Sequence, residues 1–336
     1  MNTQREQLIQ TWLQATLQTD QFEINFLAGD ASFRRYARIK LQNKTYMLMD
    51  APPEKEDCVP FVEIDEFFDK NGVRVPHIVA KDLSLGLLLL EDFGDVVLST
   101  LLNDDTVDQY YAQSFKQLID LQQIDAHQQL PAYSYEKLMT EMRLLTEWML
   151  PSLEIQPTEQ QLETIEQAFD FLAIEAINQP QVIVHRDYHS RNLMKIENEQ
   201  VLGVIDFQDA VIGADTYDLI SITRDAYVQW NAVRVYGWFE LFYNLLPATA
   251  KENRSFEQFK RDADFMAIQR HLKILGIFVR LFERDGKSGY LKDLPRVTWY
   301  LLEESQAYAE LNDFMQFVHD VVMPKFIAKY GEYEVV

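Results

Sequence analysis

Hydrophobic and polar residues repeat with two different periods along this chain, and the period changes near residue 95. Before that point, short runs in which apolar and polar residues alternate are typical of β-strands. Apolar residues at helical spacing interrupt these runs twice, and we expect helices there. The expected order is a helix at 3–17, three strands within 22–51, a helix at 57–70, and strands at 77–81 and 87–91.

After residue 95, apolar residues at positions i, i+3 and i+4 predict a helical region, which short strands around residues 182, 193 and 202 interrupt. The helices are expected at 106–124, 134–149, 158–178, 215–229, 231–245, 255–283 and 293–330. The two patterns predict an α+β protein with two lobes. A small antiparallel-sheet lobe covers 1–92, a hinge lies at 89–94, and a larger helical lobe covers 95–336.

The amino-acid composition excludes some kinds of binding partner. The chain carries 53 acidic and 31 basic residues, a formal charge of −22, which argues against binding to nucleic acid or to an anionic membrane. Its single cysteine, Cys58, cannot form an intramolecular disulfide and suits a reducing compartment. The longest strongly apolar run, 85–90, is far too short for a membrane span. We therefore expect a cytoplasmic monomer that acts on a small molecule.

Polar residues with related chemistry follow two β-branched runs. His185, Arg186 and Asp187 follow the first run, Asn192 comes five residues after Asp187, and Asp206 ends the second run. Protein kinases use an H-R-D-x-x-x-x-N loop and a later Asp for phosphoryl transfer, which needs a carboxylate near the attacking hydroxyl and ligands for a metal ion. The alternative, an ordinary polar turn and a strand-end cap, does not explain the spacing of the whole set.

The turn between the first two strands, residues 27–36, contains small residues whose N–H groups can approach a phosphate. A plain hairpin is the alternative, because the glycine-rich motif of protein kinases is absent. The kinase order of elements would also make 89–94 the segment that pairs with an adenine base.

The strand that carries the ATP-binding lysine in protein kinases has no lysine at the corresponding place here, since residues 46–50 read Tyr-Met-Leu-Met-Asp. Arg34 and Arg35 are the nearest basic residues, and one of them can face the nucleotide because neighbours alternate across a strand. Glu63 or Glu66 on the following helix could orient that arginine.

Together, several stretches of the chain resemble the aminoglycoside phosphotransferase family of kinase-like enzymes, over roughly residues 20 to 330. The first and last of them, at 29–36 and 269–296, look closer still to bacterial kinases that act on the anomeric hydroxyl of N-acetylmuramate and N-acetylglucosamine. The stretches are GDASFRRY at 29–36, LMDAPPE at 48–54, LLLEDFGD at 88–95, HRDYHSRNLM at 185–194, GVIDFQDAVIGADTYDL at 203–219, and QRHLKILGIF with RDGKSGYLKDLPR at 269–296.

The resemblance implies a two-lobed protein-kinase-like fold and transfer of the γ-phosphoryl group of ATP to the sugar, with Mg²⁺. The product would be a sugar 1-phosphate for UDP-sugar synthesis in cell-wall recycling. Asp187 would be the catalytic base, and Asn192 and Asp206 would bind the metal. Structural roles fall to His185, to Asp215 as a helix cap, and to Asp218 as an acceptor for the backbone of the catalytic loop.

We also expect two sets of contacts with ligands. The nucleotide would contact Gly29, Ser32, Phe33, Arg34, Arg35, Leu90 and Glu91. The acceptor would contact His189, Arg191, Gln208, Asp209, Arg270, Arg284 and Lys287, of which the basic residues near the end of the long helix suit a carboxylate.

Three other functions fit the same pattern. A kinase of another small hydroxylated molecule, such as an aminoglycoside, would need acidic side chains around the acceptor. The missing lysine would fit a nucleotide-binding regulator that does no chemistry. Transfer of AMP would require ATP to bind in reverse.

Overall fold

The structure, a computed structural model, describes residues 3–27 and 34–333 and confirms the expected α+β class. The chain forms two compact units. Unit 1 contains residues 1–97 and 192–208, and unit 2 contains the rest. The sequence prediction places 192–208 in the helical lobe, whereas in the structure this segment packs on the N-terminal residues. The N–H of Lys195 donates to the carbonyl of Val96 at 2.8 Å, and that of Val204 to the carbonyl of Arg74 at 2.8 Å.

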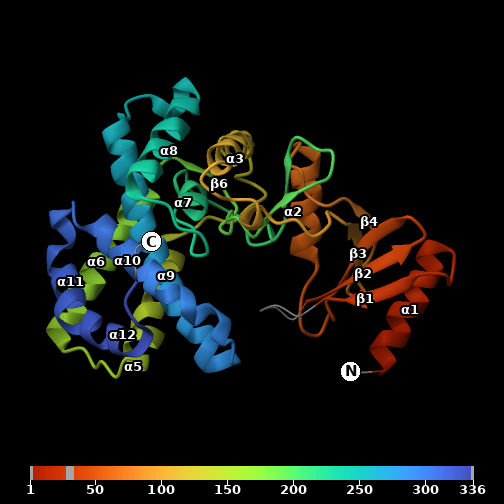
Figure 1. Ribbon diagram of the computed structural model, residues 1–336, viewed down its shortest axis with the longest axis horizontal. Coiled ribbons are helices and arrows are strands. Elements are labelled where there is room, and N and C mark those ends of the chain that lie inside the picture. The colour runs from red at the N-terminus through yellow and green to blue at the C-terminus, as the bar shows by residue number, and fades with distance from the viewer. Residues whose placement is uncertain (1–2, 28–33, 334–336) are drawn as a thin grey trace. The chain divides into compact units, whose positions relative to one another are not determined.

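Unit 1 contains a five-stranded antiparallel sheet with the strand order β1-β2-β3-β5-β4 (Figure 1). Helix α1 covers one face, where Ile9 and Leu13 pack against Ala37 and Ile39 of β2. Side chains alternate along a strand, so Tyr36 and Arg38 of β2 point to the other face. The elements are α1 (Thr3–Leu17), β1 (Glu23–Phe26), β2 (Arg35–Leu41), β3 (Lys44–Asp50), α2 (Val59–Lys70), β4 (Ile78–Asp82) and β5 (Leu87–Glu91).

A two-stranded antiparallel sheet of β7 (Leu193–Lys195) and β8 (Leu202–Val204) completes unit 1. The ring of Phe207, just after β8, lies 5.0 Å from that of Phe61 and 5.9 Å from that of Phe68. Both partners are buried on α2. These aromatic contacts fix the segment that carries Asp206 against α2.

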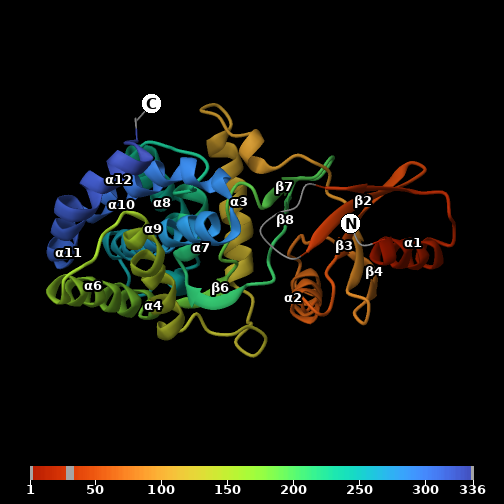
Figure 2. The same ribbon diagram turned by 90° about the horizontal axis from the view of Figure 1, so that it is seen from below.

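Helices make up most of unit 2 and surround the long helix α9, with α4, α6 and α10 packed beside it (Figures 1 and 2). A buried apolar cluster that includes Phe169, Leu172, Leu272 and Val297 joins them. The helices are α3 (Val107–Gln122), α4 (Tyr135–Leu144), α5 (Leu150–Ser152), α6 (Glu159–Ile177), α7 (Tyr217–Thr223), α8 (Ala232–Leu245), α9 (Phe256–Asp285), α10 (Leu294–Ser305), α11 (Asn312–Phe317) and α12 (Met323–Tyr330).

Three parts of unit 2 differ from the sequence prediction. Strand β6 (Gln181–Val184) pairs with β9 (Val211–Ala214), a strand that we did not expect because it is short and contains glycine. The helix expected at 215–229 ends at Thr223, since the backbone of Arg224 is no longer helical. The helix expected at 293–330 is instead a series of shorter helices.

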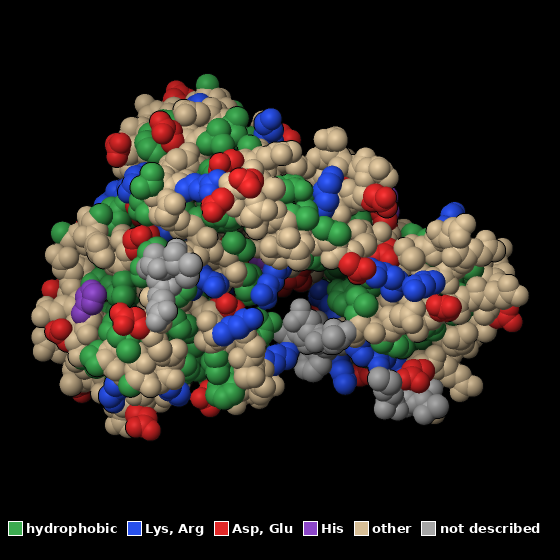
Figure 3. Space-filling view, in the orientation of Figure 1, with side chains coloured by type: hydrophobic (Ala, Val, Ile, Leu, Met, Phe, Trp, Pro, Cys, Tyr) green, Lys and Arg blue, Asp and Glu red, His purple; other side chains and the backbone are tan. Residues whose placement is uncertain are grey.

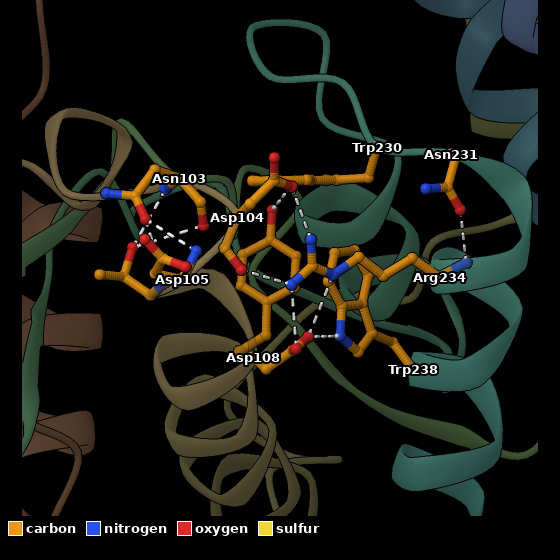
Figure 4. Close-up of polar contacts among 10 residues, drawn as sticks. Asn103, Asp104, Asp105, Asp108, Trp230, Asn231, Arg234 and Trp238 are labelled. Carbon is orange, nitrogen blue, oxygen red and sulfur yellow. Dashed lines mark hydrogen bonds and ion pairs between the residues drawn. The ribbon is translucent and has the colours of Figure 1, made fainter.

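Arg234 of α8 forms contacts that join the start of α3 to α8 (Figure 4). Its guanidinium lies over the rings of Trp230 and Trp238, at 5.3 and 5.6 Å from their centroids. It also pairs with Asp104 at 2.8 Å and with Asp108 at 2.9 Å. The indole N–H of Trp238 donates to Asp108 at 2.8 Å. These contacts hold the start of α3 against α8.

Gly276 lets α9 approach α4 closely, because an added Cβ would lie 2.3 Å from the backbone carbon of Leu144. We expect Gly276→Ala to lower the free energy of unfolding by about 1–3 kcal/mol, as overpacking does. Urea denaturation would measure the change. The control is Gly237→Ala on α8, where the added Cβ meets no described atom within 4 Å. That change should be neutral or stabilising, and equal losses in both variants would contradict the packing argument.

Within residues 3–27 and 34–333, no helix is long and apolar enough to cross a membrane. Acidic side chains are spread over the face drawn in Figure 3 rather than gathered in one patch.

Candidate active site

Asp187 lies on the loop after β6, and a buried carboxylate holds the backbone of this loop. Asp218 of α7 accepts the N–H groups of His185 at 2.6 Å and Arg186 at 3.0 Å. Arg186 has a φ of 75°, a left-handed conformation that costs free energy in a residue with a side chain. The N–H of Asp187 donates to Nδ1 of the buried His185 at 3.3 Å. Asp218 and His185 therefore hold the backbone of a strained turn that carries Asp187.

The carboxyl group of Asp187 is partly buried in basic surroundings. Burial acts to raise its pKa, but the charges of Lys273, His189, Arg270 and Arg186 more than offset burial, and the pKa lies below its ordinary value. The group is therefore ionised at neutral pH, which is the state that can accept a proton from an attacking hydroxyl.

Glu141 of α4 links two of these basic residues. Its carboxylate pairs with Arg186 at 2.5 Å and Lys273 at 3.2 Å, and it accepts the hydroxyl of Tyr133. Burial acts to raise the pKa of Glu141, but the two cations hold it below the ordinary value. The ammonium group of Lys273 also donates to the hydroxyl of Tyr217 at 3.0 Å. We did not predict Glu141, because its partners lie 45 and more than 100 residues away in the sequence.

Two residues expected to contact the acceptor meet the same tyrosine. The guanidinium of Arg191 lies 3.5 Å from the centroid of Tyr227, and the ring of His189 stands edge-on to it at 5.2 Å. Asp225 accepts the N–H groups of Ser190 and Tyr227, at 3.0 and 2.8 Å, and so ties the two segments together. Tyr227 thus holds Arg191 and His189 in place, and polar side chains fixed in this way are of the kind that orient a small ligand.

Arg270 of α9 is only 4% exposed, and its Nε and Nη1 atoms have no hydrogen-bond partner among the described residues. Its guanidinium lies 5.9 Å from the ring of Tyr217, and its charge acts on Asp187, Asp218 and Tyr227. Burial of donors without partners costs free energy. An anionic group of a ligand is a chemically suitable partner.

The other acceptor contacts expected in unit 2 remain predictions. Arg284 is exposed near the end of α9 and pairs with the adjacent Asp285 at 2.8 Å. Asp209 is largely exposed, 3.8 Å from Arg186. Lys287 follows the left-handed Gly286 that ends α9.

Asp215 does not have the capping role that we expected. Its carboxylate pairs with Arg254 at 2.6 Å, and Arg254 also binds Asp262 at 2.6 Å. Among the described residues, the N-cap of α7 is Thr216, which makes no side-chain capping bond. Asp215 is structural through this buried ion pair.

In unit 1, Asp206 and Asn192 lie side by side. The amide of Asn192 donates to one carboxylate oxygen of Asp206 at 3.3 Å, and the amide of Gln208 donates to the other at 3.0 Å. Asp206 is exposed and has a left-handed backbone with a φ of 66°. Among the described residues, no cluster of three or more His, Cys, Asp or Glu side chains could hold a metal. Carboxylate and amide oxygens suit Mg²⁺, which often takes its remaining ligands from phosphates and water, so these two residues fit such an ion.

The expected nucleotide contacts are described only in part. Gly29, Ser32 and Phe33 lie outside the described residues. Leu90 is buried in β5, and the N–H of Glu91 donates to the carbonyl of His77 at 2.9 Å. The carboxylate of Glu91 pairs with Arg74 at 2.6 Å.

The fold and these two polar loops are of a kind found in small-molecule kinases. The model of the phosphotransferase enzyme family matches residues 23–251, and the chain belongs to this family.

Among curated proteins, the chain is 38% identical to the N-acetylmuramate/N-acetylglucosamine kinase of Pseudomonas putida, over 88% of this chain and 87% of that protein. It is 40% identical to the kinase of the same name from Pseudomonas aeruginosa, over 82% and 81%. The ADP-bound structure of aminoglycoside phosphotransferase APH(2'')-Ib has a TM-score of 0.57 and 15% identity, and the match covers 93% of this chain and 99% of that one. The expected resemblance and kinase-like fold are confirmed.

Proposed function

We propose that this protein is an ATP-dependent kinase that phosphorylates the C1 hydroxyl of N-acetylmuramate or N-acetylglucosamine. The observation that carries the proposal is Asp187 on a loop whose backbone Asp218 holds, with basic residues around the carboxylate that favour its ionised form. The similarity to amino-sugar kinases over most of the chain supports the choice of substrate. The proposed setting is that expected from the sequence, a cytoplasmic monomer.

In the proposed reaction, the C1 oxygen attacks the γ-phosphorus of ATP, and the bond from that phosphorus to the bridging oxygen breaks. The products are ADP and a sugar 1-phosphate, which can serve UDP-sugar synthesis. Asp187 orients the hydroxyl and takes its proton. Asn192 and Asp206 would hold Mg²⁺, which supplies positive charge to the phosphate oxygens.

The charges around Asp187 favour an acidic or neutral acceptor over an aminoglycoside. Lys273, Arg270 and Arg186 act on this carboxylate, and Glu141 is the acidic partner of two of them. An aminoglycoside carries several positive charges, which these side chains would repel. N-acetylmuramate carries a carboxylate that could meet Arg270.

The experiment is incubation with Mg²⁺, ATP and a panel of sugars and aminoglycosides, with measurement of ADP and of the reducing end of the sugar. Phosphorylation at C1 removes the reducing end, whereas phosphorylation at C6 leaves it intact. We expect one ADP for each reducing end lost. ADP formation with the reducing end retained, or only with aminoglycosides, would contradict the proposal. Nucleotide binding without ADP formation from any acceptor would favour a regulator.

Arg270→Gln should weaken the use of N-acetylmuramate more than that of N-acetylglucosamine, because only the former carries a carboxylate for the buried guanidinium. We expect kcat/KM for N-acetylmuramate to fall roughly 10- to 100-fold, the effect of losing a charged hydrogen bond. Initial rates with both sugars measure this. The control is Arg261→Gln on the same helix, since Arg261 pairs with Glu310 at 3.0 Å. Equal losses with both sugars would rule out recognition of the carboxylate.

A further inference from the structure

In protein kinases a lysine of β3 supplies positive charge to the nucleotide phosphates, and here β3 has no lysine in its middle. The only lysine of that strand is Lys44 at its first position, which is paired with Leu41 at the end of β2. The basic group therefore has to come from another element. The two arginines that precede Tyr36, Arg34 and Arg35, differ in the face of the sheet that they occupy.

Arg35 lies on the face covered by α1. It shares strand parity with Ala37 and Ile39, both of which pack against that helix. Its guanidinium binds the fully buried carboxylate of Asp50. Arg5 of α1 binds the same carboxylate at 2.6 Å. The charge of Arg35 is thus neutralised by Asp50 in an ion-pair cluster that includes Arg5 of α1.

Arg34 precedes Arg35 by one residue, so its side chain lies on the opposite face of the sheet. It lies there among groups next to Asp206. Its Nε and Nη2 atoms donate to Glu56 at 3.1 and 2.8 Å, and the side chain is 9% exposed. Its guanidinium also lies over the ring of Phe61 at 5.8 Å. That ring touches Phe207, the residue that follows Asp206, at 5.0 Å between centroids.

Tyr36 connects Arg34 to Asp206 electrostatically. Burial raises the pKa of Tyr36 to about 12; the positive charge of Arg34 opposes this rise, and the negative charge of Asp206 adds to it. The contacts from Arg34 to Phe61 and from Phe61 to Phe207, which follows Asp206, agree with this. A cation therefore lies in the neighbourhood of the carboxylate expected to bind the metal, within unit 1 alone.

We propose that Arg34, positioned by Glu56, binds the phosphates of the nucleotide in this protein and replaces the strand lysine and its helix glutamate. This inference rests on the proposed kinase function. Guanidinium groups bind phosphate oxygens through two parallel hydrogen bonds. Glu56 engages one edge of the guanidinium, so it can orient the group much as a helix glutamate orients the lysine in protein kinases. The expected partners Glu63 and Glu66 are exposed, and Glu66 pairs with Lys81.

The remaining arginines of unit 1 are engaged elsewhere. Arg38 pairs with Asp92 at 2.6 Å and with Asp95 at 2.8 Å. Arg74 pairs with Glu91 and Glu199. Each of these two arginines is thus held by two acidic residues. Arg34 lies over Phe61, whose ring contacts Phe207 next to Asp206, and this position makes it the candidate of unit 1 for a phosphate.

The test is calorimetric binding of adenosine, ADP and ATP, with Mg²⁺, to the full chain and to Arg34→Gln, Arg34→Lys, Glu56→Gln and Arg35→Gln. Thermal melting of each variant reports its folding. Adenosine has no phosphate, so it separates a phosphate contact from a general change in the nucleotide site. The wild-type chain should bind ATP more tightly than adenosine.

We expect Arg34→Gln to weaken ATP binding roughly 10- to 100-fold, the usual effect of a lost charged hydrogen bond, and adenosine binding less than twofold. Arg34→Lys should restore part of the ATP affinity, because the charge returns without the planar geometry. Glu56→Gln should lower the ATP affinity less than Arg34→Gln does, since it removes only the residue that orients the guanidinium. Arg35→Gln should keep the preference for ATP.

Several results would overturn the assignment. One is an equal loss of adenosine and ATP affinity in Arg34→Gln, which would mark a structural role. Another is an unchanged ATP affinity in that variant, and a third is loss of the ATP preference in Arg35→Gln instead. If the wild-type chain does not bind ATP, the proposed kinase function fails together with this inference. The three results above, in contrast, overturn only the assignment of Arg34.

Discussion

Asp187→Asn should reduce kcat by roughly 10²- to 10⁴-fold, the range attributed to general base catalysis. The amide has nearly the same shape as the carboxylate, but it cannot accept the proton of the sugar hydroxyl. In this variant, the positive charges around residue 187 no longer face a carboxylate. ADP release in the presence of saturating sugar measures kcat, and ATP binding should stay close to wild type.

The control for this variant is Asp313→Asn, the same chemical change at an exposed position of α11. It should retain full activity. Near-normal turnover of Asp187→Asn would remove the assignment of the base. A large loss of ATP affinity in the same variant would point instead to a role in nucleotide binding.

Asp206→Asn should lower turnover by a comparably large factor, because it weakens the binding of the metal ion. Loss of the negative charge weakens a site that the described residues supply with one carboxylate and the amide of Asn192. A metal ion contributes several kcal/mol to such a transition state, so we expect turnover at a fixed Mg²⁺ concentration to fall by roughly 10² or more. Titration with Mg²⁺ should show a higher half-saturating concentration.

Asp20→Asn is the matched control in unit 1, because Asp20 is exposed just after α1. Binding of adenosine, which needs no metal, should be the same in both variants and in the wild type. An unchanged dependence on Mg²⁺ in Asp206→Asn would show that the carboxylate is not a metal ligand.

The sequence was most informative where the determinants of structure are local. Alternation of polarity predicted the strands of unit 1, and helical spacing predicted α9, because each pattern is a property of neighbouring residues. The motif around Asp187 was visible for the same reason. Strand β9 was missed because four residues that include a glycine do not carry a period long enough to recognise.

Partners that are distant in sequence could not be predicted. Glu141 reaches Lys273 only because α4 packs against α9. The choice between Arg34 and Arg35 depends on which face of the sheet α1 covers, which no local pattern contains. Likewise, Arg34 forms its ion pair with Glu56, which precedes α2, and this pairing is not visible in the sequence.

The chain passes between the two units at 97–98, 191–192 and 208–209. A fragment that ends at residue 97 would therefore lack β7, β8 and Asp206, and Phe61 and Phe68 would lose their contacts with Phe207. Exchange of unit 1 between related proteins would need three junctions rather than one. For this polypeptide, chimeras and split-protein designs must carry residues 192–208 along with the amino-terminal portion.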